Sequence, residues 1–250
     1  MIHDLFRYSW ILINIIGFTL LTLLFYAVSF IPLQKIGLNF RPLFRLWSVV
    51  FSHALGVNIK LHQHNKEKLP KHFIMIANHP SAFEDIGLPA LFDVISLAKI
   101  EVSNWWILGR ISDASGSLYV DRKSKKSRSN ALRTIIKKVN EGYNVALYPE
   151  GGCKDKRIAQ RFLFGAFEAS LKTGVPIIPV FIHYEAQDDF YWGPKVPLVK
   201  KLWQIFTASN HTANFHVFDA FQPQEYADKQ TYNQTVYDQY LIWQKQYLDT

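Results

Sequence analysis

The sequence predicts an α/β fold, in which helices flank a central β-sheet, with one membrane helix at the N-terminus. From residue 60 onward, short apolar runs alternate with helical patterns, as expected for an α/β sheet. Before them lies an apolar stretch long enough to cross a bilayer. With 49% hydrophobic and 15% aromatic residues, the chain is too rich in bulky apolar groups to be disordered. We expect an anchor with an amphipathic helix at 1–58 and an α/β domain at 59–250.

Charge and cysteine content narrow the functional classes. The chain has 28 Lys and Arg against 20 Asp and Glu, a net charge of +8. This charge favours an anionic partner, such as a phosphorylated metabolite, a nucleic acid or an acidic lipid surface, without choosing among them. Because Cys153 is the only cysteine, the sequence excludes an intramolecular disulfide and a multi-thiolate zinc site.

The N-terminal stretch at 10–31 reads WILINIIGFTLLTLLFYAVSFI and contains no charged residue. It is longer than the apolar region of a signal peptide, and no cleavage site precedes Pro32, so we expect an uncleaved anchor. Asn14 and Gly17 make this stretch less apolar, so the alternative is a helix that is half-inserted in the membrane or buried in the protein. Arg41 and Arg45 follow the stretch and place the main body on the cytoplasmic face, with a bacterial inner membrane favoured.

The remaining elements follow from periodicity. Residues 41–57 carry apolar positions at helical spacing, with Pro42 suited to the first turn and Gly56 to the end. A helix is also expected at 129–141, and a closing helix carries an apolar stripe from Val236 to Tyr247. Apolar runs predict strands at 73–77, 94–98, 117–120, 144–148, 176–182 and 213–218.

His62 and His64 alternate along one further expected strand. No third metal ligand follows at a recognisable spacing. We therefore expect them on the polar face of a hairpin and predict no metal site.

The first group of reactive residues lies in IANHPSAFEDIG, at the end of the strand at 73–77. The carboxyl ends of strands are where α/β folds usually place their sites. Pro80 holds His79 in an extended conformation, and Ser81-x-x-Glu84 has the form of a capping box, so Glu84 can reach back to His79 more easily than Asp85 can. A histidine held by a carboxylate can take a proton from a hydroxyl that attacks an acyl carbon. The alternative is that Glu84 only caps a helix and His79 only fills a turn.

NHPSAFE resembles the asparagine-histidine-x-x-x-x-acid motif of the glycerolipid acyltransferases, the family of 1-acylglycerol-3-phosphate and lysophospholipid acyltransferases. Three more blocks follow in the order of that family: AKIEV with GSLYVDR, then LYPEGG, then GVPIIPV preceded by FGAFEAS. The resemblance covers about 65–185. It implies a mixed central sheet flanked by helices, and a reaction with acyl-CoA or acyl-carrier protein as donor that needs no metal or other cofactor.

Residue by residue, the resemblance implies a site. His79 and Glu84 would be catalytic, and Arg122, which offers a planar guanidinium fork, would bind the phosphate of the acceptor. Alternatively, Arg122 pairs with Asp121 or is solvated. Asn78, or backbone amides near Ser81, would stabilise the oxyanion.

The other matching positions would line the acceptor or acyl pocket. Gly116 lets the backbone approach a ligand closely. Glu150 and Gly151 match the residues that line the acceptor site in the family, and Pro176 belongs to the block that shapes the pocket. A solvent-exposed turn is the alternative for Glu150.

The sequence departs from the family at three positions. Gly152 and Cys153 stand where threonine and arginine are usual, and Glu84 stands where aspartate is more frequent. These changes put the identity of the acceptor in doubt more than the reaction. A thioester on Cys153 would need a base beside it, and none is identifiable in the sequence.

These observations predict a membrane-bound O-acyltransferase that forms phosphatidate from 1-acylglycerol 3-phosphate in phospholipid biosynthesis. The alternatives are a lysophospholipid with a head group or a lyso-aminolipid as acceptor, and a non-catalytic protein that binds anionic lipid or nucleic acid. In the favoured interpretation, the partners are the lysolipid, the acyl thioester and the bilayer, with acyl-carrier protein as a partner where it carries the acyl group, and nucleic acid is not a partner.

Overall fold

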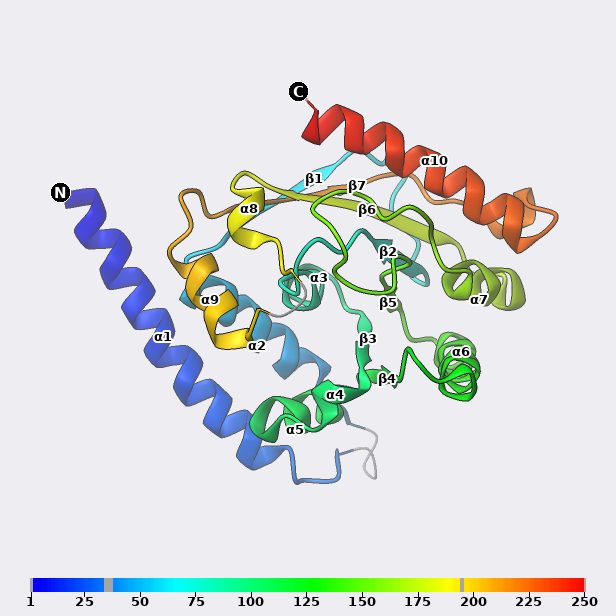
Figure 1. The fold of residues 1–250 in the computed structure, drawn as a ribbon. Helices are drawn as coiled ribbons and strands as arrows, with labels where there is room; N and C mark the ends of the chain where they lie inside the picture. The colour runs from blue at the N-terminus through cyan, green and yellow to red at the C-terminus, as the bar shows by residue number, and fades with distance from the viewer. Residues whose placement is uncertain (1, 34–37, 194–195, 250) are drawn as a thin grey trace.

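The computed structural model describes residues 2–33, 38–193 and 196–249, with side chains from Tyr8 onward. Its seven described strands form one mixed sheet in the order β1-β7-β6-β2-β5-β3-β4 (Figure 1). The strands are β1 (Asn58–Gln63), β2 (Ile74–Ala77), β3 (Ile95–Lys99), β4 (Leu118–Val120), β5 (Val145–Leu147), β6 (Ile177–Tyr184) and β7 (Thr212–Val217). The α-helices are α1 (Ile2–Val28), α2 (Arg41–Ala54), α3 (Glu84–Leu91), α4 (Ile100–Ser103), α5 (Trp106–Ser115), α6 (Lys125–Asn140), α7 (Gly165–Thr173), α8 (Gln187–Phe190), α9 (Leu198–Phe206) and α10 (Lys229–Leu248).

Strand direction decides where the site forms. Among the paired strands, only β6 and β7 are antiparallel to each other. β2, β3, β4, β5 and β6 are therefore mutually parallel, and their carboxyl ends lie along one edge of the sheet. The segments that follow these ends begin at residues 78, 100, 121, 148 and 185, so parts of the chain that are far apart in sequence meet there.

Side chains alternate between the two faces of the sheet, and each face has its own core. On one face, Ile74 and Ile76 of β2 pack with residues of α6, α7 and α10. On the other face, Met75 and Ala77 pack with residues of α3, α8 and α9. This period of two is the usual pattern of a strand covered on both faces. Figure 1 shows α6, α7 and α10 grouped away from α1, α2, α5 and α9.

A third apolar cluster joins α1 to the body. Phe25 of α1 and Trp47 of α2 are buried with Ile111 of α5, and the indole of Trp47 donates a hydrogen bond of 2.8 Å to the hydroxyl of Thr22. Residues 8–28 have the length and apolarity of a membrane-crossing helix, with a mean hydropathy of 2.3 and only 17% of the segment buried. One side of α1 is thus packed on protein, and the rest of its apolar surface is uncovered.

Most predicted elements are present, with shifted boundaries. The predicted helix at 10–31 corresponds to α1, and the one at 41–57 to α2, which ends at Ala54. The predicted helix at 129–141 begins earlier, because Ser124 caps α6 by accepting a hydrogen bond from the amide of Ser127. The predicted closing stripe is buried in α10 at Val236, Tyr240 and Trp243.

The predicted hairpin at His62 and His64 is wrong. β1 pairs parallel with β7, its partner more than 140 residues away, so no hairpin exists here. Instead, both imidazoles join His216 of β7 and His183 of β6 in a cluster of stacked rings beneath Tyr247 of α10. The ring of His62 lies 4.4 Å from that of His216 between centroids, and Nε2 of His64 lies 2.9 Å from Nδ1 of His216. We call these four residues the histidine cluster.

Candidate active site

His79 and Glu84 form a buried pair at the carboxyl end of β2. Nδ1 of His79 lies 3.0 Å from Oε2 of Glu84, and both side chains are almost completely buried. β2 ends at Ala77, Pro80 interrupts the chain, and α3 begins at Glu84, so the carboxylate faces back toward the imidazole. Because the carboxylate accepts from Nδ1–H, the tautomer leaves the Nε2 lone pair free to take a proton.

Glu84 is held in place by other donors. The backbone N–H of Ser81 lies 3.1 Å from each carboxylate oxygen, and the hydroxyl of Tyr184 donates a short hydrogen bond to Oε1. The predicted capping box is therefore only half formed. Glu84 bonds back to Ser81, but α3 starts three residues after Ser81, whose hydroxyl accepts from the amide of Phe83. The local geometry serves His79 as well as the helix.

Burial sets the protonation states of this pair. It lowers the pKa of His79 to about 4, which the charge of Asp85 partly opposes and that of Arg122 reinforces. Burial also raises the pKa of Glu84 well above its usual range, and the hydrogen bond from Tyr184 opposes this shift. At neutral pH the imidazole is uncharged, which is the form able to accept a proton.

Two further groups surround His79. The ring of Tyr148 stacks on the imidazole with centroids 4.0 Å apart and an interplanar angle of 11°. Burial raises the pKa of the Tyr148 phenol well above its usual range, and the charges of Asp85 and Glu84 raise it further. Asp85 is half-buried, and the partial removal of its carboxyl group from water raises the pKa of that group. The imidazole thus lies against an aromatic face, with two acids beside it.

Glu150 holds the backbone beneath His79. Its two carboxylate oxygens accept from the amides of His79 at 2.8 Å and Ala159 at 3.0 Å. Burial raises the pKa of Glu150 to about 7, despite these two hydrogen bonds. The carboxylate therefore ties the loop after β5 to the turn that carries His79.

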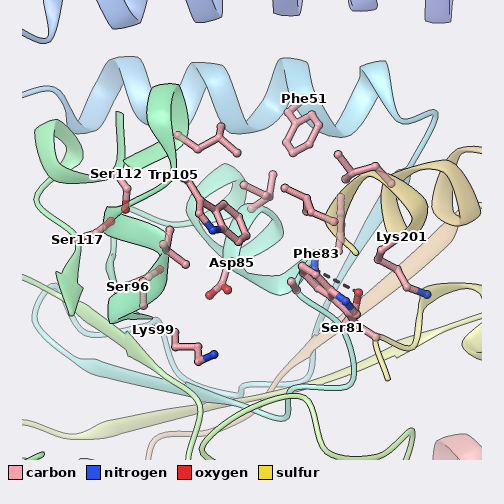
Figure 2. Close-up of a pocket in the computed structure, with 18 of the residues that line it drawn as sticks. Phe51, Ser81, Phe83, Asp85, Ser96, Lys99, Trp105, Ser112, Ser117 and Lys201 are labelled. Atoms are coloured by element: carbon pink, nitrogen blue, oxygen red, sulfur yellow. Dashed lines mark hydrogen bonds between the residues drawn. The ribbon is translucent and has the colours of Figure 1, made fainter. Parts of the chain in front are cut away.

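A cavity of about 360 Å³ opens beside His79. One part of its wall is apolar and comes mainly from helices: Phe44, Trp47 and Phe51 of α2, Leu55 directly after α2, Leu108 and Ile111 of α5, and Leu198, Leu202 and Ile205 of α9. The other part is polar: His79, Ser81, Asp85, Ser96, Lys99, Ser112, Ser117, Arg122, Cys153 and Lys201. Figure 2 shows Asp85 and Lys99 on the side of the cavity opposite Phe51. Such a division suits a molecule with an apolar chain and a charged head.

Arg122 and Lys99 bring positive charge to the polar wall. Arg122 follows β4 and Lys99 ends β3, so the parallel register of these two strands places both cations at the same edge. A Cβ atom on Gly152 would lie 2.6 Å from Nη1 of Arg122, so the guanidinium occupies the space that a side chain would need. This contact gives a physical reason for glycine at the position where the family usually has threonine.

Other predicted site residues lie elsewhere. The Asn78 side chain bonds to both backbone groups of Ile182 at 2.7 Å and so joins the turn to β6. Gly116 ends α5 with a φ of 87°, Gly151 approaches Leu163, and the carbonyl of Pro176 accepts from the amide of Ile74. Like Glu84 and Glu150, none of these four lines the cavity. The structure gives them supporting roles in the fold, whereas Ser81 and Arg122 reach the cavity wall.

The Cys153 thiol is hydrogen-bonded to the turn that follows His79. Sγ lies 3.0 Å from the carbonyl oxygen of Ser81, to which it donates. Burial raises the pKa of this thiol far above its usual range, and Glu84 and Asp85 raise it further. A thiolate nucleophile is therefore disfavoured. Among the described residues, no group of three or more His, Cys, Asp or Glu side chains is arranged to hold a metal ion.

Several site residues escaped the sequence analysis. Lys99 lies in the quoted AKIEV block, and its position at the end of a strand was a usable signal. Tyr148 lies in the LYPEGG block, but nothing in the sequence predicts its stacking on His79. Tyr184 is 100 residues from its partner Glu84, so only the strand order brings the two together.

The sequence is similar to a known family and to several acyltransferases. The family model described as Acyltransferase matches residues 60–183, about half of the chain. The lyso-ornithine lipid O-acyltransferase of Rhizobium meliloti is 27% identical over 188 residues, covering 70% of this chain and 63% of that protein. The 1-acyl-sn-glycerol-3-phosphate acyltransferase of Haemophilus influenzae is 24% identical over 179 residues, covering 70% of this chain and 72% of that protein.

The fold has a counterpart among solved structures. The 1-acyl-sn-glycerophosphate acyltransferase PlsC of Thermotoga maritima superposes with a TM-score of 0.61 at 19% identity, covering 90% of this chain and 93% of that one. The match to the R. meliloti relative spans less than two thirds of that protein's length. The family model and the relatives show that the chain belongs to the acyltransferase family that includes the 1-acylglycerol-3-phosphate and lysophospholipid acyltransferases, and the solved structure shows the shared fold.

Proposed function

We propose that the protein transfers a fatty acyl group from acyl-CoA or acyl-carrier protein to the hydroxyl of 1-acylglycerol 3-phosphate, forming phosphatidate. The observation that carries this proposal is the His79–Glu84 pair, which lies beside a cavity with one apolar wall and one cationic wall. The base, the space for an acyl chain and the cations for a phosphate are present together.

The geometry supports the following steps for the proposed acyl transfer. His79 Nε2 takes the proton of the acceptor hydroxyl as that oxygen attacks the thioester carbonyl. The tetrahedral intermediate collapses, the carbon–sulfur bond breaks, and the imidazolium returns its proton to the departing thiolate. Glu84 fixes the tautomer and stabilises the imidazolium, since its carboxylate accepts from Nδ1. The N–H of Ser81 donates to Glu84, and the N–H of Phe83 donates to the Ser81 hydroxyl. We therefore assign neither of these two groups as an oxyanion donor.

Arg122 and Lys99 favour an acceptor with a phosphate monoester. Both line the cavity, and the Arg122 fork suits two phosphate oxygens at once. These two cations lie on the polar wall of a cavity whose other wall is apolar, and this division matches a lysolipid whose head is a phosphate and whose tail is an acyl chain.

A lyso-ornithine lipid is the second candidate acceptor. Its head carries an ammonium group as well as a carboxylate. Asp85 lines the cavity together with Arg122 and could pair with that ammonium group. A relative named for this acceptor aligns over 70% of the chain. The reaction is the same, and only the group bound at the polar wall differs.

For the cell, we propose a membrane-bound enzyme whose α/β domain lies on the cytoplasmic face, in a bacterial inner membrane. The apolar helix α1 and the lipid acceptor support membrane attachment. Acyl-CoA and acyl-carrier protein are both cytoplasmic thioesters, which supports this orientation.

The test is transfer of a labelled acyl group from acyl-CoA and from acyl-carrier protein to three acceptors: 1-acylglycerol 3-phosphate, a head-group-bearing lysophospholipid and a lyso-ornithine lipid. Each pair is assayed with wild type, Arg122→Ala, Asp85→Asn and His79→Ala as the blank. Product from the phosphate monoester that Arg122→Ala abolishes and Asp85→Asn spares supports the first acceptor. Product from the ornithine lipid that Asp85→Asn abolishes supports the second. No transfer by folded wild type with any pair would refute the proposal.

A further inference from the structure

The outer face of α9 is apolar and has no protein partner among the described residues. Val199 is 79% exposed and Trp203 is 65% exposed, four residues apart and so on one side of the helix. The inner face carries Leu202 and Ile205, which pack on the core. A tryptophan exposed this far in water needs an explanation, because large apolar surfaces usually mark a contact.

A second exposed tryptophan lies on the far side of the cavity. Trp106 opens α5 and is 79% exposed, whereas its neighbour Trp105 lines the cavity. The ring of Trp106 meets that of Tyr26 of α1 at a centroid distance of 6.4 Å. The apolar surface of α1 therefore continues onto α5. In Figure 1, α9 and α5 lie on the same side of the molecule as α1.

We propose that the outer faces of α9 and the start of α5 form a second contact with the phospholipid bilayer, in addition to α1. We call Val199, Trp203 and Trp106 the apolar rim. The rim holds the cavity between α9 and α5 against the lipid from which the acceptor comes. The inference goes beyond the proposed reaction but rests on it in one respect, because both substrates of that reaction carry acyl chains.

A bilayer fits this surface better than a protein does. The uncovered apolar surface of α1, which needs an apolar environment, continues into Trp106. α9 reads LVKKLWQIF and contains no acidic residue, and Lys200 flanks the exposed apolar pair. A short helix with tryptophan and lysine around an apolar face is typical of a segment lying at the lipid–water interface.

The rim also explains a feature of the cavity wall. Leu198, Leu202 and Ile205 of α9 line the cavity, while Val199 and Trp203 face outward from the same helix. α9 is thus a single layer between the cavity and the outside. If its outer face lies in lipid, this one helix is all that separates this part of the cavity from the acyl chains of the bilayer.

The test places a fluorescent probe at single positions of the full chain in vesicles of phosphatidylcholine and phosphatidylglycerol. Trp203→Cys and Trp106→Cys report on the rim, Leu20→Cys on α1, and Ile242→Cys on α10 as the matched control, because Ile242 is also exposed, at 59%, but lies on the opposite side of the sheet. Each variant is labelled with an environment-sensitive dye, and quenching by nitroxide-bearing lipids is measured. Wild type labelled in parallel corrects for Cys153.

We expect quenching at residues 20, 203 and 106 and none at residue 242. Quenching at residue 20 with residues 203 and 106 behaving like residue 242 would overturn the proposal. So would a blue shift at residue 203 without lipid quenching, because a protein partner or a second copy of the chain would then cover α9. No step of this measurement uses a substrate, so it stands or fails independently of the acyl transfer.

A kinetic comparison adds a second readout. Val199→Ser with Trp203→Ser should lower turnover of an acceptor embedded in vesicles by about tenfold and leave turnover of the same acceptor in detergent micelles within about twofold. Ile242→Ser is the control and should change neither rate. An equal loss in vesicles and micelles would mean that α9 acts through the cavity wall and not through the bilayer.

Discussion

His79 and the histidine cluster are two histidine sites on one sheet, built from different partners, and His79 and His216 are their buried members. The imidazole of His79 meets a carboxylate at 3.0 Å and borders a cavity. In the cluster, His64 meets His216, while His62 and His183 bond to the side chain of Asn214 at 2.9 Å and 3.1 Å. The facing groups from other elements are Glu185, which accepts from Asn214, and Tyr247 of α10, stacked at 4.0 Å on His216.

The two sites differ in the groups that a protonated imidazole would contact. In the proposed reaction, the imidazolium of His79 forms next to the Glu84 carboxylate, which stabilises its charge. At His216, a proton would face three other histidines, and burial together with their charge lowers the pKa of His216 to about 3. In the proposed reaction His79 gains and releases a proton, whereas burial and the neighbouring histidines disfavour a proton on His216.

The largest expected effect separates the two sites by activity. His79→Ala should lower kcat by about 10²- to 10⁴-fold, because the general base is removed. His216→Gln should leave kcat within about twofold, since the cluster does not border the cavity. Initial rates of acyl transfer, with circular dichroism to verify folding, measure both. A comparable loss of kcat in folded His216→Gln would contradict the expectation that only His79 acts in the transfer.

The partner of each histidine can be tested by an isosteric change. Glu84→Gln should lower kcat by about 10²- to 10⁴-fold, because the amide no longer selects the Nδ1–H tautomer. Glu84→Asp keeps the charge and should retain more activity than Glu84→Gln. If Glu84→Gln and Glu84→Asp lost activity equally, Glu84 would act through shape and not through its charge.

Acid should destabilise both sites, because burial lowers the pKa of His79 to about 4 and that of His216 to about 3, and His216→Gln isolates the share of the cluster. Because the folded-state pKa of His216 lies below its unfolded value near 6.5, its contribution is complete above about pH 6.5 and is lost as the pH falls toward 3. We expect His216 alone to lower the free energy of unfolding by about 1–2 kcal/mol between pH 7 and pH 5. Urea unfolding at several pH values measures this, with His216→Gln as the variant that should flatten the curve. An unchanged slope in His216→Gln would assign the acid sensitivity to other groups.

The smallest expected effect concerns the cation at the active site. Gly152→Ala should displace the Arg122 guanidinium and raise KM for a phosphate-bearing acceptor by about fivefold, with kcat nearly unchanged. Gly174→Ala is the matched control, because Gly174 also has a positive φ, of 70°, and has nothing within 4 Å of an added Cβ atom. Equal effects of the two substitutions on KM would mean that backbone strain, and not contact with Arg122, is responsible.

Local patterns predicted much of this molecule. The strands at 73–77 and 176–182 were visible as apolar runs, and Glu84 was preferred over Asp85 as the partner of His79 because the capping-box pattern lets Glu84 reach back. What escaped prediction is non-local. The histidine cluster depends on β7 lying between β1 and β6, and the Tyr184–Glu84 bond depends on β6 lying beside β2. Nor did the sequence indicate that Asn78 and Glu150 bind backbone instead of facing the cavity.

The parallel pairing of β1 with β7 also sets the order of events during synthesis. Asn58 pairs with Thr212, so the two strands are about 150 residues apart in the chain. At 5–20 residues per second, β1 leaves the ribosome about 8 to 30 seconds before its partner. During that interval α1 has already emerged, whereas the edge of the sheet and the bond from Tyr184 to Glu84 do not yet exist. The nascent chain can therefore engage lipid well before its catalytic centre is assembled.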